Sequence, residues 1–191
     1  MKTVVLKFGG TSVGTIEKIK KVAEIIGIYR KKNYKVIVVS SAMGGVTNEL
    51  VKKSKEISEN FSNTEYDTLV CSGEQVSCSL IAGRLIHKGF KARSWLAWQI
   101  PIITKGVNKN SRIHQINKKR IVKYLNEGGI PIIAGFQGIN DKGRLTTIGR
   151  GGSDASAIML AKFFNAKRCI IYTDVEGVYT TDPKKLRKAK K

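Results

Sequence analysis

The sequence has no long apolar run, and this absence excludes a membrane-spanning helix. Its longest apolar stretches, such as the one from Ile130 to Phe136, fall far short of the roughly 20 residues that cross a bilayer. The segment from Met1 to Lys7 has too few apolar residues before its next charge to serve as a secretory signal. We therefore expect a cytoplasmic protein that makes no use of a membrane.

Cysteine and histidine are too scarce to build a disulfide framework or a zinc site. The chain has three cysteines and two histidines, with no C-x-x-C pair. Cys71 and Cys78 lie seven residues apart, so both can occupy one helix face as small buried hydrophobic residues, an interpretation that we favour over reactive thiols. The sequence predicts no metal held by protein side chains alone.

Acidic residues are also few, at 14 against 35 lysines and arginines, which gives a formal net charge of +21. Such a field attracts nucleic acids, anionic membranes and anionic metabolites alike. The basic residues are scattered, and the densest run, from Lys184 to Lys191, has no aromatic residue to stack on bases. We expect no specific nucleic-acid binding, although a basic binding protein remains an alternative.

At 191 residues and 41% hydrophobic, the chain can bury one sizeable core. Strand-like and helix-like patterns alternate along it, which indicates βαβ units and an α/β fold: a three-layer αβα sandwich with a mainly parallel central sheet. A turn signal at 140–143 suggests a hairpin between 138 and 147. Strands are expected at 3–8, 36–40, 91–95, 100–104, 130–136 and 168–172, the fourth and fifth of them central, and helices at 13–26, 48–59, 66–87 (interrupted at 72–74), 117–126 and 155–164.

Glycine-rich turns follow several of these strands, where ligands bind in parallel sheets. We expect Gly9-Gly10, Gly44-Gly45, Gly151-Gly152 and Thr173-Asp174 to gather at one edge. Lys7, at the end of the first strand, precedes glycines whose backbone N–H groups can cradle a phosphate, with Thr11 or Ser12 available to cap the next helix. An ordinary turn is the alternative, because the segment is neither a Walker A sequence nor G-x-G-x-x-G.

Two further places carry groups suited to an amino acid. In the segment 149–154, Arg150 offers a planar fork for a carboxylate, and Ser153 or Asp154 can cap the following helix. Glu74 is a carboxylate among apolar neighbours, which suits a substrate ammonium. Each has a plain alternative: a helix cap with a surface arginine, and a first-turn glutamate favoured by the helix dipole.

Taken together and in order, six segments closely resemble the aspartate kinases of the amino acid kinase superfamily. Two of them, KFGGTSV and GRGGSD, separate that family from its relatives acting on acetylglutamate, carbamate or UMP. The resemblance implies an amino acid kinase-like (carbamate kinase-like) fold and transfer of the ATP γ-phosphoryl group to the β-carboxylate of L-aspartate. The product would be 4-phospho-L-aspartate, the first step towards lysine, threonine and methionine. The six segments are 7–13, 40–48, 72–74, 136–138, 146–154 and 173–183.

The resemblance also assigns roles to individual residues. Lys7 and Asp154 would be catalytic, Lys7 by stabilising the moving phosphoryl group and Asp154 by orienting Lys7. Magnesium would travel with ATP, bound chiefly through phosphate oxygens. The implied substrate-binding residues are Ser41, Thr47, Glu74, Arg150, Gly151, Gly152 and Ser153, and the implied nucleotide-binding residues are Lys7, Phe8, Gly9, Gly10, Thr173, Asp174, Tyr179, Asp182 and Lys184.

The chain departs from the family pattern in two places. Lys105 stands where the family usually has aspartate, in a basic loop that reaches Arg112. In the family, the kinase domain continues well beyond Pro183 and paired ACT modules usually follow. We therefore expect an incomplete catalytic domain at 1–183 and a basic tail at 184–191. Three possibilities stay open: a kinase completed by homo-oligomerisation or a complementing polypeptide, a truncated and catalytically impaired fragment, or a basic binding protein on the same scaffold.

Overall fold

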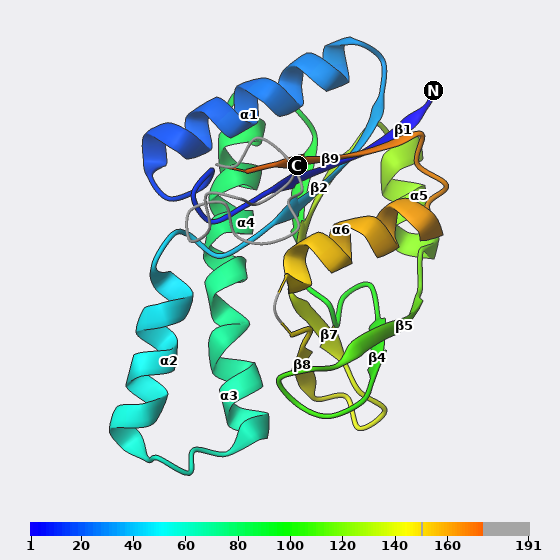
Figure 1. Ribbon diagram of the computed structural model, residues 1–191. Helices are drawn as coiled ribbons and strands as arrows, with labels where there is room; N and C mark the ends of the chain where they lie inside the picture. Colours follow the sequence, from blue (N-terminus) through cyan, green and yellow to red (C-terminus); the bar gives the residue numbers. More distant parts are fainter. Residues whose placement is uncertain (150, 174–191) are drawn as a thin grey trace, which may run out of the picture.

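A computed structural model of the protein describes residues 1–149 and 151–173. Its centre is a parallel sheet of five strands in the order β3-β6-β2-β1-β9 (Figure 1). The strand order explains the sequence pattern, because the three inner strands are buried on both faces and are almost entirely apolar. The strands are β1 (Thr3–Phe8), β2 (Lys35–Ser40), β3 (Ala92–Trp95), β6 (Ile130–Ala134) and β9 (Arg168–Tyr172).

Helices cover both faces of this sheet, which confirms the predicted three-layer sandwich. Helices α1 (Ile16–Lys31) and α4 (Ser72–His87) pack on one face, and α5 (Lys119–Asn126) and α6 (Gly152–Phe163) on the other. The two-residue period of β1 divides its side chains between the faces: Leu6 and Phe8 join the core under α1 and α4, and Val5 joins the core under α6.

A second sheet of four strands, in the order β5-β4-β7-β8, lies beside the first. The sequence predicted a strand of the central sheet at 100–104. The strand there is β4 (Ile102–Lys105), and it belongs to the second sheet. Ile100 and Ile102 are fully buried, as a central strand requires, but burial does not reveal which sheet a strand joins. The predicted hairpin is confirmed as antiparallel β7 (Gln137–Ile139) and β8 (Leu145–Thr147), whereas β5 (Arg112–Ile116) was not predicted.

Helices α2 (Val46–Ile57) and α3 (Asn63–Val70) form a pair that projects away from the central sheet (Figure 1). Helix α3 passes into α4 at Cys71, so the break falls just before the predicted interruption at 72–74, which is the first turn of α4. Within 1–149 and 151–173, no helix combines the length and apolar character that a bilayer crossing needs.

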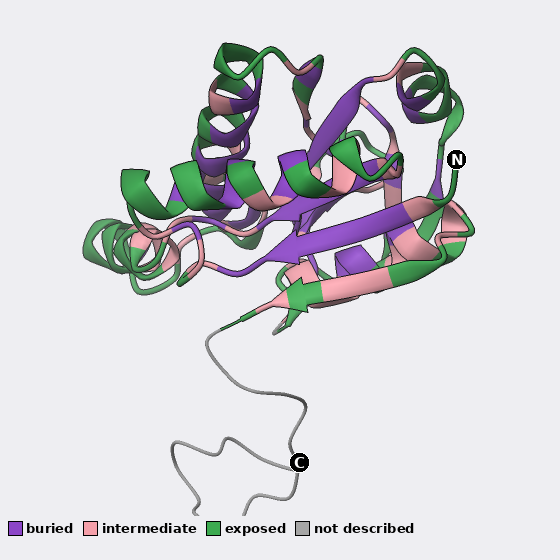
Figure 2. Cartoon of the chain, turned by 90° about the horizontal axis from the view of Figure 1, so that it is seen from above, coloured by how far each residue is buried: buried purple, intermediate pink, exposed green. Residues whose placement is uncertain are grey.

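The start and cap of α1 differ from the sequence-based expectation, whereas β9 has the predicted bounds. Helix α1 begins at Ile16, and its cap is Thr15, whose hydroxyl accepts a hydrogen bond from the Lys18 N–H at 3.3 Å, so neither Thr11 nor Ser12 caps it. Strand β9 forms one edge of the sheet and is partly exposed, beside the buried β1 (Figure 2). The predicted boundary at 183 and the basic tail lie outside the described residues.

Candidate active site

The candidate site lies where the carboxyl ends of the parallel strands meet. Backbone hydrogen bonds tie successive ends together: the Ser41 N–H donates to the Phe8 carbonyl at 3.1 Å, and the Gly135 N–H donates to the Ser40 carbonyl at 3.0 Å. On the other side of β1, the Gly9 N–H donates to the Tyr172 carbonyl at 3.2 Å. Because β2 and β9 flank β1, the first glycine turn is held from both sides.

A cavity of about 330 Å³ opens between these turns and the start of α6. It holds many of the residues that the sequence singled out, from four separate segments of the chain. Those that line it are Lys7, Gly10, Ser41, Thr47, Glu74, Gly151, Gly152, Ser153 and Asp154, together with Ala42, Met43, Gly44, Gly45, Phe136 and Gly149, which were not assigned a role.

The remaining expected residues lie beside the cavity or outside the described part of the chain. Phe8 is fully buried and its ring stacks on Tyr172 at 4.7 Å, so only its backbone is available to a ligand. A Cβ on Gly9 would lie 3.4 Å from Lys7 Nζ, which places Gly9 next to that ammonium. Thr173 directly follows β9 and is exposed. Arg150, Asp174, Tyr179, Asp182 and Lys184 are outside the described residues.

Lys7 and Asp154 form an ion pair inside the cavity. Alternation along β1 places Lys7 on the same side as Val5, towards α6, and Asp154 lies in the first turn of that helix. The distance from Lys7 Nζ to Asp154 Oδ1 is 2.6 Å, and Lys7 is only 7% exposed. The carboxylate therefore offsets the cost of burying the ammonium. The amino terminus of α6 carries partial positive charge, which favours the ionised form of Asp154 in the first turn of that helix.

The same turn corrects the predicted helix cap. Helix α6 begins at Gly152, its cap position is Gly151 in the left-handed region at φ 72°, and no side chain there accepts a capping hydrogen bond. Ser153 and Asp154 consequently belong to the helix itself. Both residues line the cavity, and Asp154 pairs there with Lys7.

Glu74 is a buried carboxyl group with half of its hydrogen-bonding capacity unused. It is 2% exposed, and its Oε1 accepts a hydrogen bond from the Ala42 N–H at 3.1 Å. No described residue donates to its Oε2. Burial raises the pKa of Glu74 to about 7, with the Ala42 hydrogen bond opposing that rise. A carboxylate in this position would be stabilised by a cationic ligand in the cavity.

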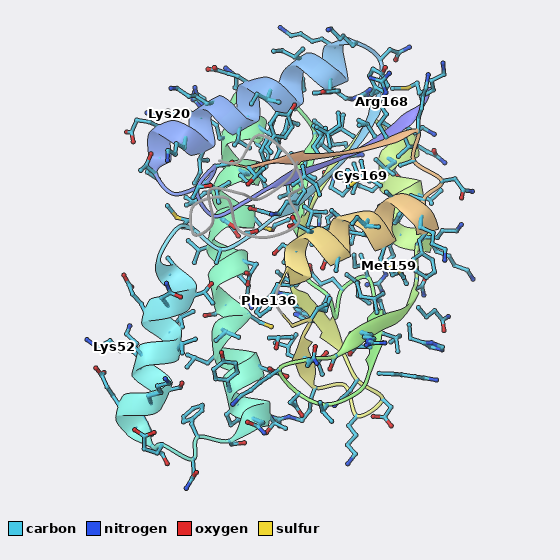
Figure 3. All side chains as sticks on the ribbon, in the orientation of Figure 1. Lys20, Lys52, Phe136, Met159, Arg168 and Cys169 are labelled. Atoms are coloured by element: carbon cyan, nitrogen blue, oxygen red, sulfur yellow. The ribbon has the colours of Figure 1, made fainter. Side chains whose placement is uncertain are left out.

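Phe136 is the most informative residue that sequence reasoning left without a role. It has a positive φ of 65°, which is rare for an aromatic residue, and its N–H donates to Ser156 Oγ at 3.1 Å. A Cβ on Gly152 would lie 2.6 Å from the ring, so Phe136 packs directly on the first residue of α6. Figure 3 labels it at the junction of α6 and the second sheet. In the sequence, the only sign of a role for Phe136 is its place in the segment 136–138, one of the six that carry the family resemblance.

Gly10 marks a close approach of two turns, and this gives a prediction. A Cβ at Gly10 would lie 2.9 Å from the Ala42 carbonyl oxygen, a backbone atom that cannot move aside cheaply. We expect Gly10→Ala to lower the free energy of unfolding by about 1–3 kcal/mol. Gly83→Ala is the matched control, because Gly83 lies in α4 and a Cβ there would meet no atom within 4 Å. This substitution should raise the free energy of unfolding by up to about 1 kcal/mol. Urea unfolding of both variants tests the prediction, and equal effects would contradict it.

In residues 1–149 and 151–173 no group of three or more histidine, cysteine, aspartate or glutamate side chains could hold a metal ion. The donors in the cavity are instead one lysine, hydroxyl groups and glycine backbone. Such a set suits the oxygen atoms of an anionic ligand.

The sequence matches the amino acid kinase family over residues 2–191. It is 50% identical over 194 aligned residues to an aspartokinase of Rickettsia felis, covering all of this chain and 48% of that protein. An aspartate kinase structure from Synechocystis shares 40% identity at a TM-score of 0.80, covering 98% of this chain and 31% of that one. E. coli aspartokinase III, solved with aspartate and ADP, shares 28% identity at a TM-score of 0.83, covering 99% and 53%. The chain thus spans about half the length of the curated relative.

Proposed function

The chain belongs to the amino acid kinase family, and from this premise we propose that it transfers the γ-phosphoryl group of ATP to the β-carboxylate of L-aspartate. The observation that carries the proposal is that one cavity holds a buried ammonium, Lys7, and a buried carboxylate, Glu74. A phosphoryl donor needs the first, and an amino-acid acceptor with a free ammonium needs the second. Relatives named aspartokinase, including one solved with aspartate and ADP, support this choice of substrates.

Lys7 stabilises the charge that develops as the phosphoryl group moves, and Asp154 holds the lysine in place through their 2.6 Å ion pair. The turn at Gly9-Gly10 lies against the phosphates, and the Gly10 N–H is its donor because the Gly9 N–H already binds the Tyr172 carbonyl. Phosphoryl transfer requires alignment and charge neutralisation rather than a protein nucleophile, and these residues supply both. Magnesium, when bound with ATP, neutralises the phosphates, and it needs no cage of protein carboxylates to do so.

The acceptor lies at the other end of the cavity. Glu74 receives its ammonium, while Arg150 binds the α-carboxylate. Gly151, Gly152, Ser153, Ser41 and Thr47 supply further hydrogen bonds, and Phe8, Thr173, Asp174, Tyr179, Asp182 and Lys184 belong to the nucleotide side. On this proposal the enzyme works in the cytoplasm and opens the route to lysine, threonine and methionine, with the catalytic domain at 1–183.

The test is formation of aspartyl hydroxamate from Mg-ATP, L-aspartate and hydroxylamine. N-acetyl-L-aspartate is the matched control, because it keeps both carboxylates and lacks the ammonium that Glu74 would bind. We expect product from aspartate and at least about tenfold less from the acetylated acceptor, as expected for the loss of one charge-assisted hydrogen bond. Absence of product from a folded chain that binds Mg-ATP would exclude kinase activity for this chain alone.

The same preparation tests the expected partner, a homo-oligomer or a complementing polypeptide. Light scattering gives the mass of the particle, and the activity of each size fraction shows which form works. Activity confined to a multimer would support self-association, whereas a monomer that is inactive until a second polypeptide is added would support complementation.

A further inference from the structure

Asp67, in α3, is a fully buried carboxylate that the proposed reaction does not use. Its oxygens accept hydrogen bonds from Asn108 Nδ2 at 2.7 Å, from the Lys109 N–H at 3.1 and 3.2 Å, and from Thr147 Oγ1 at 2.8 Å. In the part of the chain that the structure describes, no cationic side chain forms an ion pair with it. These donors alone compensate its burial, so losing one of them is costly.

The partners of Asp67 belong to two segments that meet at the turn before α6. Thr147 ends β8, and its carbonyl accepts a hydrogen bond from the Ser111 N–H at 2.9 Å. Asn110 packs so closely on Gly149 that a Cβ there would lie 2.6 Å from Asn110 Oδ1. Gly149 lines the candidate active site. Asp67 therefore holds both the loop 107–111 and the strand end that together support the turn.

The loop 107–111 is the middle of the basic loop from Lys105 to Arg112, and it is held against α3. Lys109 has a positive φ of 65°, and its ammonium lies 4.3 Å from the centroid of the Tyr66 ring, next to Asp67 in the chain. A backbone conformation of this kind persists only when its surroundings hold it. Two contacts from neighbouring residues of α3 do so here, which makes the loop a fixed spacer between the helix and the turn.

Asp67 is also connected to Glu74. Helix α3 continues into α4 through Cys71, whose N–H donates to the Asp67 carbonyl at 3.1 Å. Gln137 Nε2 donates to the Cys71 carbonyl at 3.2 Å, which fixes this junction against β7. The backbone of Asp67 thus belongs to the continuous helical segment that carries Glu74. Its carboxylate holds the loop and the strand end that support the turn at Gly149 and Gly152.

We propose that Asp67 is a positioning residue that sets the spacing between Glu74 and the Gly149–Gly152 turn, the two parts of the cavity that receive the amino-acid acceptor. The inference rests on the proposed function for the identity of that acceptor. It assigns Asp67 no contact with substrate. Its removal should therefore loosen the acceptor side of the site and leave the nucleotide side, built on β1, unchanged.

The test compares Asp67→Asn, Thr147→Val and Thr147→Ser in the full chain. For Asp67→Asn and Thr147→Val we expect amide hydrogen exchange at 147–149 and 151–153 to rise about tenfold, with exchange in β1 unchanged. We expect the KM for aspartate to rise about tenfold and the KM for Mg-ATP to change less than about twofold. Thr147→Ser keeps the hydroxyl, so its amide exchange at the turn and its KM for aspartate should both stay close to those of the wild type. Ile121→Val, a buried change in α5, is the control for general destabilisation.

Hydrogen exchange makes this inference independent of catalysis. Unchanged exchange at the turn, or an equal rise throughout the chain as in Ile121→Val, would overturn the role of Asp67 even in an active enzyme. A folded wild-type chain that binds Mg-ATP but phosphorylates no amino acid would overturn the proposed function instead. If Asp67→Asn does not fold, Thr147→Val carries the test, because it removes only one of the donors.

Discussion

Lys7→Ala is expected to lower the rate of phosphoryl transfer about a thousandfold while the chain stays folded. Lys7 is the buried ammonium of the cavity, and it is aimed by a 2.6 Å ion pair with Asp154. A group placed where charge develops in the transition state typically contributes about 3–4 kcal/mol in a site shielded from water. The side chain of Asp154 is 44% exposed, so water can solvate the carboxylate that the substitution leaves unpaired. The hydroxamate assay on wild type and variant measures the loss.

Lys52→Ala is the matched control for this experiment. It removes the same charge from a chain of net charge +21, but Lys52 lies on α2 with its side chain 79% exposed, and its ion-pair partner among the described residues is the exposed Glu56. We expect Lys52→Ala to change turnover less than about twofold, because an exposed ion pair contributes little. A thousandfold loss in Lys7→Ala alone would locate the effect in the cavity. Turnover within about threefold of wild type in Lys7→Ala would remove Lys7 from the mechanism.

The sequence predicted the central layer well because its signals are local. The run from Thr3 to Phe8, the glycines after it and the helical spacing that follows all specify one β-turn-α unit within about 30 residues. The same reasoning located Lys7 and Glu74, since each lies in or beside a recognisable turn. The resemblance to aspartate kinases then assigned both to one site, and the structure places both at one cavity.

What the sequence did not predict depends on contacts between distant segments. The second sheet could not be separated from the first, because an apolar run such as 100–104 has the same pattern in either. Asp67 reads as an ordinary polar residue of an amphipathic helix, and its partners lie 41, 42 and 80 residues further along the chain. Phe136 lines the cavity with a positive φ, a conformation that its residue type does not favour and that the sequence pattern does not signal.

Glu74 links the pH dependence of stability to that of acceptor binding. Burial raises the pKa of Glu74 from 4.5 to about 7. Between these pH values the folded chain holds a proton that the unfolded chain has lost, so this residue makes the protein less stable as pH rises from 4.5 to 7. The effect is absent below that range and complete above it, and it amounts to about 3 kcal/mol at most. Glu74→Gln should lack this dependence in urea unfolding at a series of pH values.

The same substitution should impair the acceptor side of the site, and this separates a binding carboxylate from a merely buried one. An ammonium ligand binds the ionised form of Glu74, so the wild-type KM for aspartate should rise about tenfold for each pH unit below 7. Glu74→Gln should raise that KM about 10–100-fold at pH 8 through loss of a charged hydrogen bond, and it should remove the pH dependence. The KM for Mg-ATP is the internal control. A variant that gains stability at high pH but keeps the wild-type KM for aspartate would show that Glu74 binds no ammonium, because burial alone would then account for its pKa.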